Sequence, residues 1–324
     1  MTSLLSNPGK VRGLTRVTDE DGHFVVLAID HPENYLAMLN PAWQEVPAAD
    51  VSRSKLGLVA RFAPYASAFL LDPMWSAAQS VHAGVLPRTV GLIASVERLS
   101  YTPDGRFAAT SELRPGWSVE KAKRMGADAV KMVFWWRPDA PNAAEILRVN
   151  DELVAECARH DIALIVEPLW YPGPDGGDGD RTEILLRAAE VFTRAGIDVL
   201  KSEFPVDLSS AAGRERAPDA LAELDAATGG TPWVLLSGSV PYDVFAEQVE
   251  LASRAGASGF MAGRAIWGDA VRAHQAGDTE TVEEAVGRLR ELGGIVRRFG
   301  RPWREVPAVE EVAAAVAPDW YEGY

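Results

Sequence analysis

The sequence predicts a single-domain (β/α)8 barrel, and three observations support this. Eight short runs rich in apolar and β-branched residues recur along the chain, each followed by a longer segment with helical periodicity. Their centres lie about 33 residues apart on average, close to the length of one βα unit. The first run continues as Asp30-His31-Pro32-Glu33. It therefore lacks the glycine-rich turn that marks an open, doubly wound sheet.

The eight runs are predicted to be parallel strands, and several helices before them end on glycine. In chain order the predicted strands are Phe24–Asp30, Ala68–Asp72, Gly91–Val96, Ala129–Phe134, Ala163–Pro168, Val199–Glu203, Trp233–Ser239 and Gly259–Arg264. Gly126, Gly196 and Gly256 each precede a strand by a few residues, as expected for a helix that ends on glycine and turns directly into the sheet.

The remaining segments are assigned as loops and terminal elements of a domain that spans residues 1–324. Residues 1–22 are expected to form an N-terminal extension, and residues 279–324 to contain closing helices at Val282–Gly300 and Val309–Val316. Proline and glycine mark turn-rich loops at Ser100–Trp117 and Tyr171–Asp180. The first is expected to be an active-face loop or a short hairpin. The aromatic segment Trp320–Tyr324 is expected to be a docked or frayed tail, and folding over the barrel mouth is the alternative.

Composition limits the kinds of partner. The chain has 47% hydrophobic and 24% charged residues, which is ordinary for a globular protein, and a net charge of −14. That charge argues against non-specific binding to nucleic acid or to anionic membranes. The single cysteine, Cys157, excludes an intramolecular disulfide and fits a buried structural thiol. With no apolar segment of membrane-spanning length and no signal-peptide pattern, we expect a cytoplasmic protein. Whether it forms a homo-oligomer stays open.

Four charged residues lie in otherwise apolar predicted strands. Asp30 and Glu167 are close to the ends of the first and fifth strands, while Lys131 and Lys201 lie in the fourth and sixth. Since strand C-termini build the active site of a (β/α)8 barrel, and an unpaired buried charge is costly, we expect all four to meet at the barrel mouth.

Two lysines and two carboxylates match what imine chemistry requires. A nucleophilic amine must lose its proton, and burial together with a second ammonium favours the neutral form, so Lys131 is a candidate second cation beside Lys201. Glu167 is the candidate proton shuttle. Asp30 is expected to hold a substrate hydroxyl and the Lys131 ammonium in register.

The last two strands predict a phosphate site. They end in Ser237-Gly238-Ser239 and Gly263-Arg264, and the loops after strands seven and eight are the usual phosphate site of this fold. A phosphorylated ligand is therefore expected.

Other residues near strand ends are weaker candidates for substrate contact. His31 follows Asp30, and Trp135-Trp136-Arg137 follows the fourth strand, where the rings are predicted either to line a sugar site or to pack under the helices. The five histidines are scattered without ligand spacing, so the sequence predicts neither a metal site nor a cofactor.

Together these motifs resemble the class I tagatose-1,6-bisphosphate aldolase family, the DeoC/LacD-type aldolases, a group that includes the sulfofructose-phosphate aldolases. The segments that carry the likeness lie between about Phe24 and Asp269. They are Ala127-Asp128-Ala129-Val130-Lys131, Glu167-Pro168, Asp198-Val199-Leu200-Lys201-Ser202-Glu203, Leu236-Ser237-Gly238-Ser239-Val240 and Ala262-Gly263-Arg264-Ala265-Ile266-Trp267.

The resemblance implies cleavage of a phosphorylated ketose to dihydroxyacetone phosphate and an aldehyde. It implies that Lys201 forms the Schiff base, that Glu167 is the acid/base, and that Asp30 and Lys131 support them. Where the family has Asp-Gln-Arg, this chain has Asp30-His31-Pro32. It thus leaves open whether the far end of the substrate carries phosphate, sulfonate or neither. Another imine-forming lyase, of deoxyribose-phosphate-aldolase or transaldolase type, and a non-catalytic sugar-phosphate-binding barrel are the alternatives.

Overall fold

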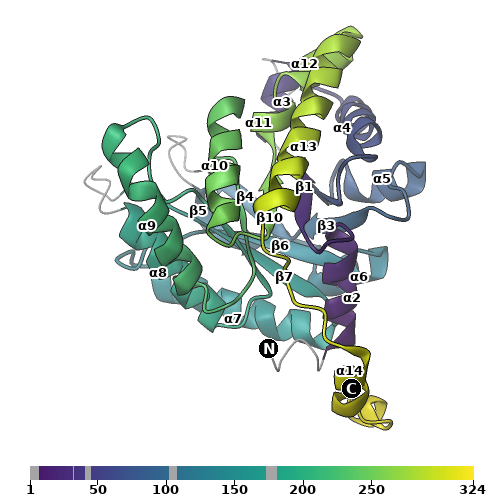
Figure 1. Ribbon diagram of the computed structural model, residues 1–324. Helices are drawn as coiled ribbons and strands as arrows, with labels where there is room; N and C mark the ends of the chain where they lie inside the picture. The colour runs from purple at the N-terminus through teal and green to yellow at the C-terminus, as the bar shows by residue number, and fades with distance from the viewer. Residues whose placement is uncertain (1–6, 32, 41–44, 102–107, 173–180) are drawn as a thin grey trace.

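The computed structural model describes residues 7–31, 33–40, 45–101, 108–172 and 181–324, and its centre is a closed barrel (Figure 1). Neighbouring strands are parallel, in the order β1-β10-β9-β8-β7-β6-β3-β2, and β1 pairs with both β2 and β10, so the sheet has no edge. All eight predicted barrel strands are present. They are β1 (Phe24–Ala28), β2 (Ala68–Leu71), β3 (Gly91–Ser95), β6 (Ala129–Trp135), β7 (Ala163–Leu169), β8 (Val199–Ser202), β9 (Trp233–Leu235) and β10 (Gly259–Ala262).

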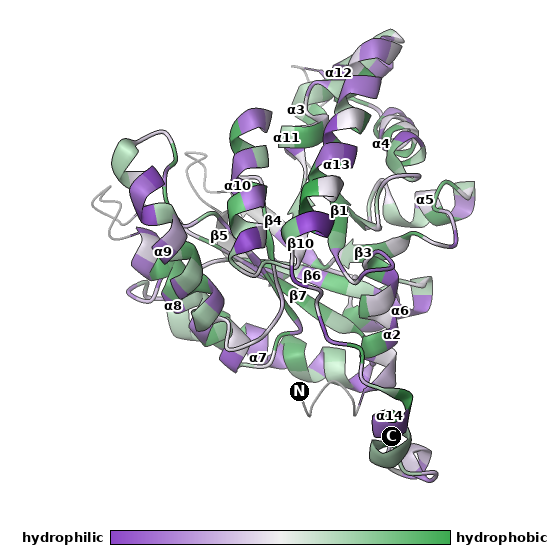
Figure 2. Cartoon of the chain, in the orientation of Figure 1, coloured by the Kyte–Doolittle hydropathy of each residue, from purple (hydrophilic) through white to green (hydrophobic). Residues whose placement is uncertain are grey.

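Helices surround the barrel. Figure 2 shows both polar and apolar residues on the outer helices, while β6 and β7 are largely apolar. The helices are α2 (Pro8–Val17), α3 (Glu33–Leu39), α4 (Ala48–Phe62), α5 (Ala77–Ala83), α6 (Val119–Met125), α7 (Ala143–Arg159), α8 (Arg181–Arg194), α9 (Ala211–Ala227), α10 (Tyr242–Arg254), α11 (Arg264–Trp267), α12 (Ala270–Ala276), α13 (Thr279–Phe299), α14 (Val309–Ala315) and the 3-10 helix η2 (Trp320–Gly323). Gly126, Gly196 and Gly256 all have positive φ, as predicted for residues that end helices.

The strands place alternate residues inside the barrel. Side chains two positions apart share one face of a strand, so each strand carries a row of inward residues. The inward residues nearer the N-terminal ends of the strands form an apolar inner core, which includes Ile93, Ala129, Ile165, Val199 and Val234. Continuing each row by two residues in β6, β7 and β8 gives Lys131, Glu167 and Lys201. The charged cluster therefore lies next to the inner core, on the side of the C-terminal ends of the strands.

The predicted N-terminal extension contains a helix that packs against the barrel. Leu14 and Val17 of α2 are fully buried in the same cluster as the inner core. Gly13 permits this approach, because a Cβ there would lie 2.2 Å from the backbone oxygen of Asp128. Asp128 immediately precedes β6, so α2 covers the N-terminal end of the barrel, opposite the charged cluster.

The predicted strand ends differ from those of the structure by one to four residues, and the largest difference is at the seventh strand. The seventh strand was expected to reach Ser239 but ends at Leu235, and Gly238 and Ser239 have φ of 54° and 64°, which an extended strand cannot contain. The excursion after the third strand, predicted to be an active-face loop or a short hairpin, is a hairpin of β4 (Glu97–Tyr101) and β5 (Ala108–Leu113), so the hairpin alternative is confirmed. Its residues 102–107, and residues 173–180 of the second predicted loop, lie outside the described part of the chain.

The C-terminal tail lies at the same end of the barrel as α2. Figure 1 shows α14 close to α2, and the side chain of Tyr324 approaches Gly9 and Asp161, just before β7. Cys157 is buried on α7, as predicted, and burial raises its pKa to about 12. Among the described residues, no helix has the length and apolar character to cross a membrane.

Candidate active site

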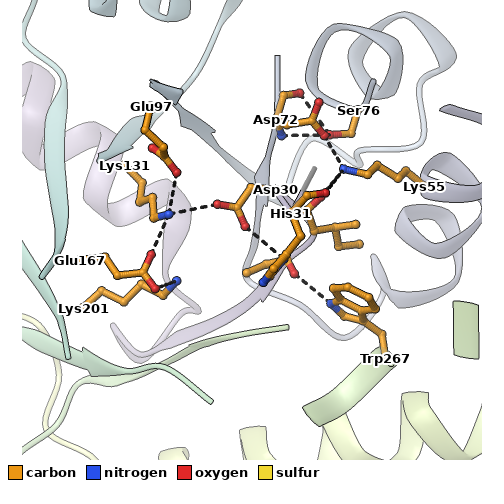
Figure 3. A network of polar contacts seen from close by, with 12 residues as sticks. Asp30, His31, Lys55, Asp72, Ser76, Glu97, Lys131, Glu167, Lys201 and Trp267 are labelled. Carbon is orange, nitrogen blue, oxygen red and sulfur yellow. Dashed lines mark hydrogen bonds and ion pairs between the residues drawn. The ribbon is translucent and has the colours of Figure 1, made fainter. Parts of the chain in front are cut away.

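The structure brings the four predicted strand-end charges together, with Lys131 at their centre (Figure 3). Its Nζ lies 3.2 Å from Asp30 Oδ2, 2.7 Å from Glu167 Oε2 and 2.7 Å from Glu97 Oε1. The Lys131 side chain is only 4% exposed, so these contacts form away from water. The predicted contact between Asp30 and Lys131 is therefore confirmed.

Glu167 bridges the two lysines. While one carboxylate oxygen contacts Lys131, the other, Oε1, lies 2.9 Å from Lys201 Nζ. The alternation of side chains along β7 places Glu167 inside the barrel, and its neighbours β6 and β8 supply the two ammonium groups. One carboxylate is thus within proton-transfer distance of both amines.

Burial and charge act on this cluster in opposite directions. Burial alone would lower the pKa of Lys131, but Asp30, Glu167 and Glu97 outweigh it and hold that pKa well above its usual range. Burial likewise opposes the lowered pKa of Asp30 and of Glu167, which Lys131 mainly causes. Glu97 differs, because burial raises its pKa despite the contact with Lys131. Lys131 is therefore a stable cation at neutral pH.

A cavity of about 300 Å³ opens over the cluster and contains most of the predicted site residues. Its charged and histidine lining comprises Asp30, His31, Lys131, Glu167, Lys201, Glu203 and Arg264. Ser237, Gly238, Ser239 and Gly263 line it as well. The two loops predicted to bind phosphate therefore border the same cavity as Lys201. A larger surface groove between α8 and α9 has none of the four strand-end charges.

Trp135, Trp136 and Arg137, which were predicted to follow the fourth strand, have different surroundings in the structure. Trp135 lines the cavity, whereas Trp136 is buried on the opposite face and packs edge-to-face against Phe192. Each of the two roles proposed for this pair thus fits one ring. Arg137 does not line the cavity. Its guanidinium contacts both carboxylate oxygens of Asp139 and the carbonyl of Tyr171.

His31 lies beside the cluster as a neutral group. Its Nδ1 is 3.6 Å from Asp30 Oδ1, and its ring packs edge-to-face on Trp267. Burial lowers the pKa of His31 to about 4, against the attraction of Asp30. The imidazole is thus uncharged at neutral pH.

Two groups next to the site were not predicted from the sequence. Glu97 was missed because the third strand was predicted to end at Val96, yet Ile93, Ser95 and Glu97 follow the same alternation, which is the signal that could have identified it. Lys55 on α4 was missed because its helix gives no indication of a buried partner. Its Nζ lies 2.6 Å from Asp72 Oδ2, and both side chains are almost inaccessible.

Comparison with known families gives a match over most of the chain. The family described as DeoC/LacD family aldolase matches residues 25–269. A tagatose 1,6-diphosphate aldolase 2 from Streptococcus mutans is 28% identical, with 93% of this chain and 98% of that protein covered. A tagatose 1,6-diphosphate aldolase from Listeria monocytogenes is 30% identical over 82% of this chain and 83% of its own length.

Solved structures with the same fold include aldolases of low sequence identity. A fructose-bisphosphate aldolase from Slackia heliotrinireducens superposes with a TM-score of 0.67 at 15% identity, covering 98% of this chain and 91% of that one. A Schiff-base-forming fructose-1,6-bisphosphate aldolase superposes with a TM-score of 0.60 at 20% identity, covering 90% of this chain and 99% of the other. These likenesses support the barrel fold.

Proposed function

Because the chain belongs to the DeoC/LacD family of aldolases, and is therefore a carbon–carbon lyase, we propose that it is a class I aldolase whose Lys201 forms a Schiff base with a phosphorylated ketose. The products are dihydroxyacetone phosphate and an aldehyde. The observation that carries this proposal is the position of Glu167, 2.9 Å from Lys201 Nζ and 2.7 Å from Lys131 Nζ. A buried carboxylate in contact with the nucleophilic amine is what imine formation and hydrolysis require.

Glu167 is assigned the proton transfers. Glu167 accepts a proton from the Lys201 ammonium, and the neutral amine attacks the ketone carbon. The proton on the attacking nitrogen passes to the former carbonyl oxygen to give the carbinolamine, and Glu167 then gives its proton to the carbinolamine hydroxyl, which leaves as water. The resulting iminium accepts the electron pair of the C3–C4 bond as that bond breaks, and the C4 hydroxyl proton passes to a carboxylate as the aldehyde forms. Protonation of the enamine at C3 and hydrolysis then release dihydroxyacetone phosphate and restore Lys201.

Lys131 and Asp30 are assigned supporting roles. Lys131 remains protonated because three carboxylates surround it, so it fixes Glu167 and Asp30 rather than competing as the nucleophile. Asp30 lines the cavity and is positioned to accept a hydrogen bond from a substrate hydroxyl. This division of roles favours Lys201 as the imine-forming residue.

The loops after β9 and β10 are assigned the phosphate. Ser237, Gly238, Gly263 and Arg264 border the cavity that also contains Lys201. A guanidinium and a serine hydroxyl are suitable donors for a phosphate group. Two relatives bear names that specify tagatose 1,6-diphosphate, so ketose 1-phosphates and 1,6-bisphosphates form the substrate class we propose.

Borohydride trapping tests the proposal. Reduction of the iminium gives a stable secondary amine, so incubation with substrate and borohydride is expected to leave an adduct on one lysine, assigned by peptide mass spectrometry. We expect that lysine to be Lys201, and Lys201→Met to abolish trapping and turnover. A panel of ketose 1-phosphates, ketose bisphosphates and sulfofructose 1-phosphate identifies the substrate. An adduct on Lys131, or near wild-type turnover by Lys201→Met, would refute the mechanism.

A further inference from the structure

A further buried lysine, Lys55, lies behind the site and outside the cavity lining. Lys55 on α4 is 0% exposed, and its Nζ donates hydrogen bonds to the carbonyl oxygens of Ile29 (2.8 Å) and His31 (3.0 Å) and to Asp72 Oδ2 (2.6 Å). Figure 3 shows this group on the side of Asp30 away from Lys131. Both carbonyl acceptors belong to residues adjacent to Asp30 in the chain.

These contacts fix the chain on both sides of Asp30. Strand β1 ends at Ala28, and the N–H of Ile29 still bonds to the carbonyl of Leu70 at 2.9 Å. Asp30 therefore lies just past the regular sheet. Since its Oδ2 must stay within 3.2 Å of Lys131 Nζ, a small displacement of this segment would break the contact.

The Lys55 ammonium is held in a fixed environment. Asp72 is itself oriented by Ser76 Oγ at 2.6 Å and by the backbone N–H groups of Met74 (2.9 Å) and Trp75 (2.7 Å). The ring of Tyr35 lies 4.9 Å from Lys55 Nζ. A buried ion pair contributes little net stability compared with apolar residues of similar size, so the main effect of this arrangement is geometric.

We propose that Lys55, held by Asp72, is a positioning residue. It keeps the Asp30 carboxylate within contact distance of the Lys131 ammonium and so sets the rate of the imine chemistry. The inference rests on the function proposed above. Lys55 itself does not line the cavity, so its effect on the reaction is expected to act through Asp30. Its loss is therefore expected to lower kcat more than it changes KM.

The chain offers a matched control at the opposite end of the barrel. Lys10 Nζ lies 2.7 Å from Asp198 Oδ2, and both residues are buried. Asp198 also accepts a bond from the N–H of Leu164, so this carboxylate likewise contacts the backbone. Removing both charges avoids leaving an unpaired one, so the two variants to compare are Lys55→Met/Asp72→Asn and Lys10→Met/Asp198→Asn.

Steady-state kinetics, borohydride trapping and urea unfolding are measured for both variants. We expect kcat of Lys55→Met/Asp72→Asn to fall at least about tenfold with KM within about threefold of wild type, since small misplacements of catalytic groups have large rate effects. Trapping at Lys201 is expected to slow in parallel. The control variant is expected to lose comparable stability while its kcat stays within about threefold of wild type.

The outcomes separate the two proposals. Equal kcat values for the two double variants, with trapping intact in the wild-type enzyme, would overturn the positioning role alone. Absence of any trapped adduct in the wild-type enzyme with every substrate in the panel would overturn the proposed function and, with it, this inference.

Discussion

Replacing Lys131 with methionine tests the electrostatic account of the site. The substitution keeps most of the side-chain volume and removes the cation that three carboxylates contact within 3.2 Å. Taking one partner from a buried ion pair costs about 3–5 kcal/mol, because the remaining charge is left unpaired. We expect a loss of this size in the free energy of unfolding near neutral pH.

The loss is expected to depend on pH. In the wild-type protein the pKa values of Asp30 and Glu167 are lowered on folding, so their contribution to stability is present at neutral pH and is lost as the pH falls. Without Lys131, burial and mutual repulsion raise the pKa of these carboxylates in the folded state, so the variant loses stability as the pH rises. The difference between the two proteins should therefore be largest near neutrality and shrink in acid.

Urea unfolding from about pH 5 to about pH 8 measures this difference. Glu97, whose pKa burial already raises, should be the easiest carboxylate to neutralise. Lys131→Met/Glu97→Gln is therefore expected to recover part of the stability lost by Lys131→Met. A loss below about 1 kcal/mol, or one that does not change with pH, would contradict the electrostatic account.

Three further predictions concern the phosphate site, the effect of a metal chelator and the packing of α2 against the barrel. Arg264→Ala is expected to raise KM by the equivalent of roughly 1.5–3 kcal/mol with a smaller change in kcat, and an unchanged KM for every phosphorylated substrate would refute the assignment. Activity is expected to survive prolonged incubation with EDTA, because an iminium is the proposed electron sink, and a loss reversed by zinc would contradict this. Gly13→Val is expected to lower stability by about 1–3 kcal/mol or more through overlap with the Asp128 carbonyl, measured by urea unfolding, and wild-type stability would show that α2 shifts freely.

The barrel was predictable from the sequence because its strands and helices repeat with regular spacing. All eight strands lie where predicted, since local apolar runs determine which segments form strands. The end of the seventh strand was misplaced because its termination depends on the left-handed backbone at Gly238 and Ser239. Ser239 is not a glycine, so its residue type gives no indication of a left-handed backbone conformation.

The charged cluster was partly predictable for the same geometric reason. Lys131, Glu167 and Lys201 lie in strands whose parallel pairing brings equivalent ends together. Lys55 could not be found in this way, because it lies on a helix and its contacts join segments 17 to 26 residues away. Arg137 was predicted near the substrate from its position after the fourth strand, but the structure directs it to Asp139.

The packing of α2 against the barrel extends the hydrophobic core beyond the region that the family matches. The family match starts at residue 25, after this helix. A chain shortened to the matched region would lose Leu14 and Val17, and the part of the inner core that α2 covers would be exposed to water. The segment before the first strand is thus an integral part of the hydrophobic interior, and shortened forms of the enzyme that are meant to fold should retain it.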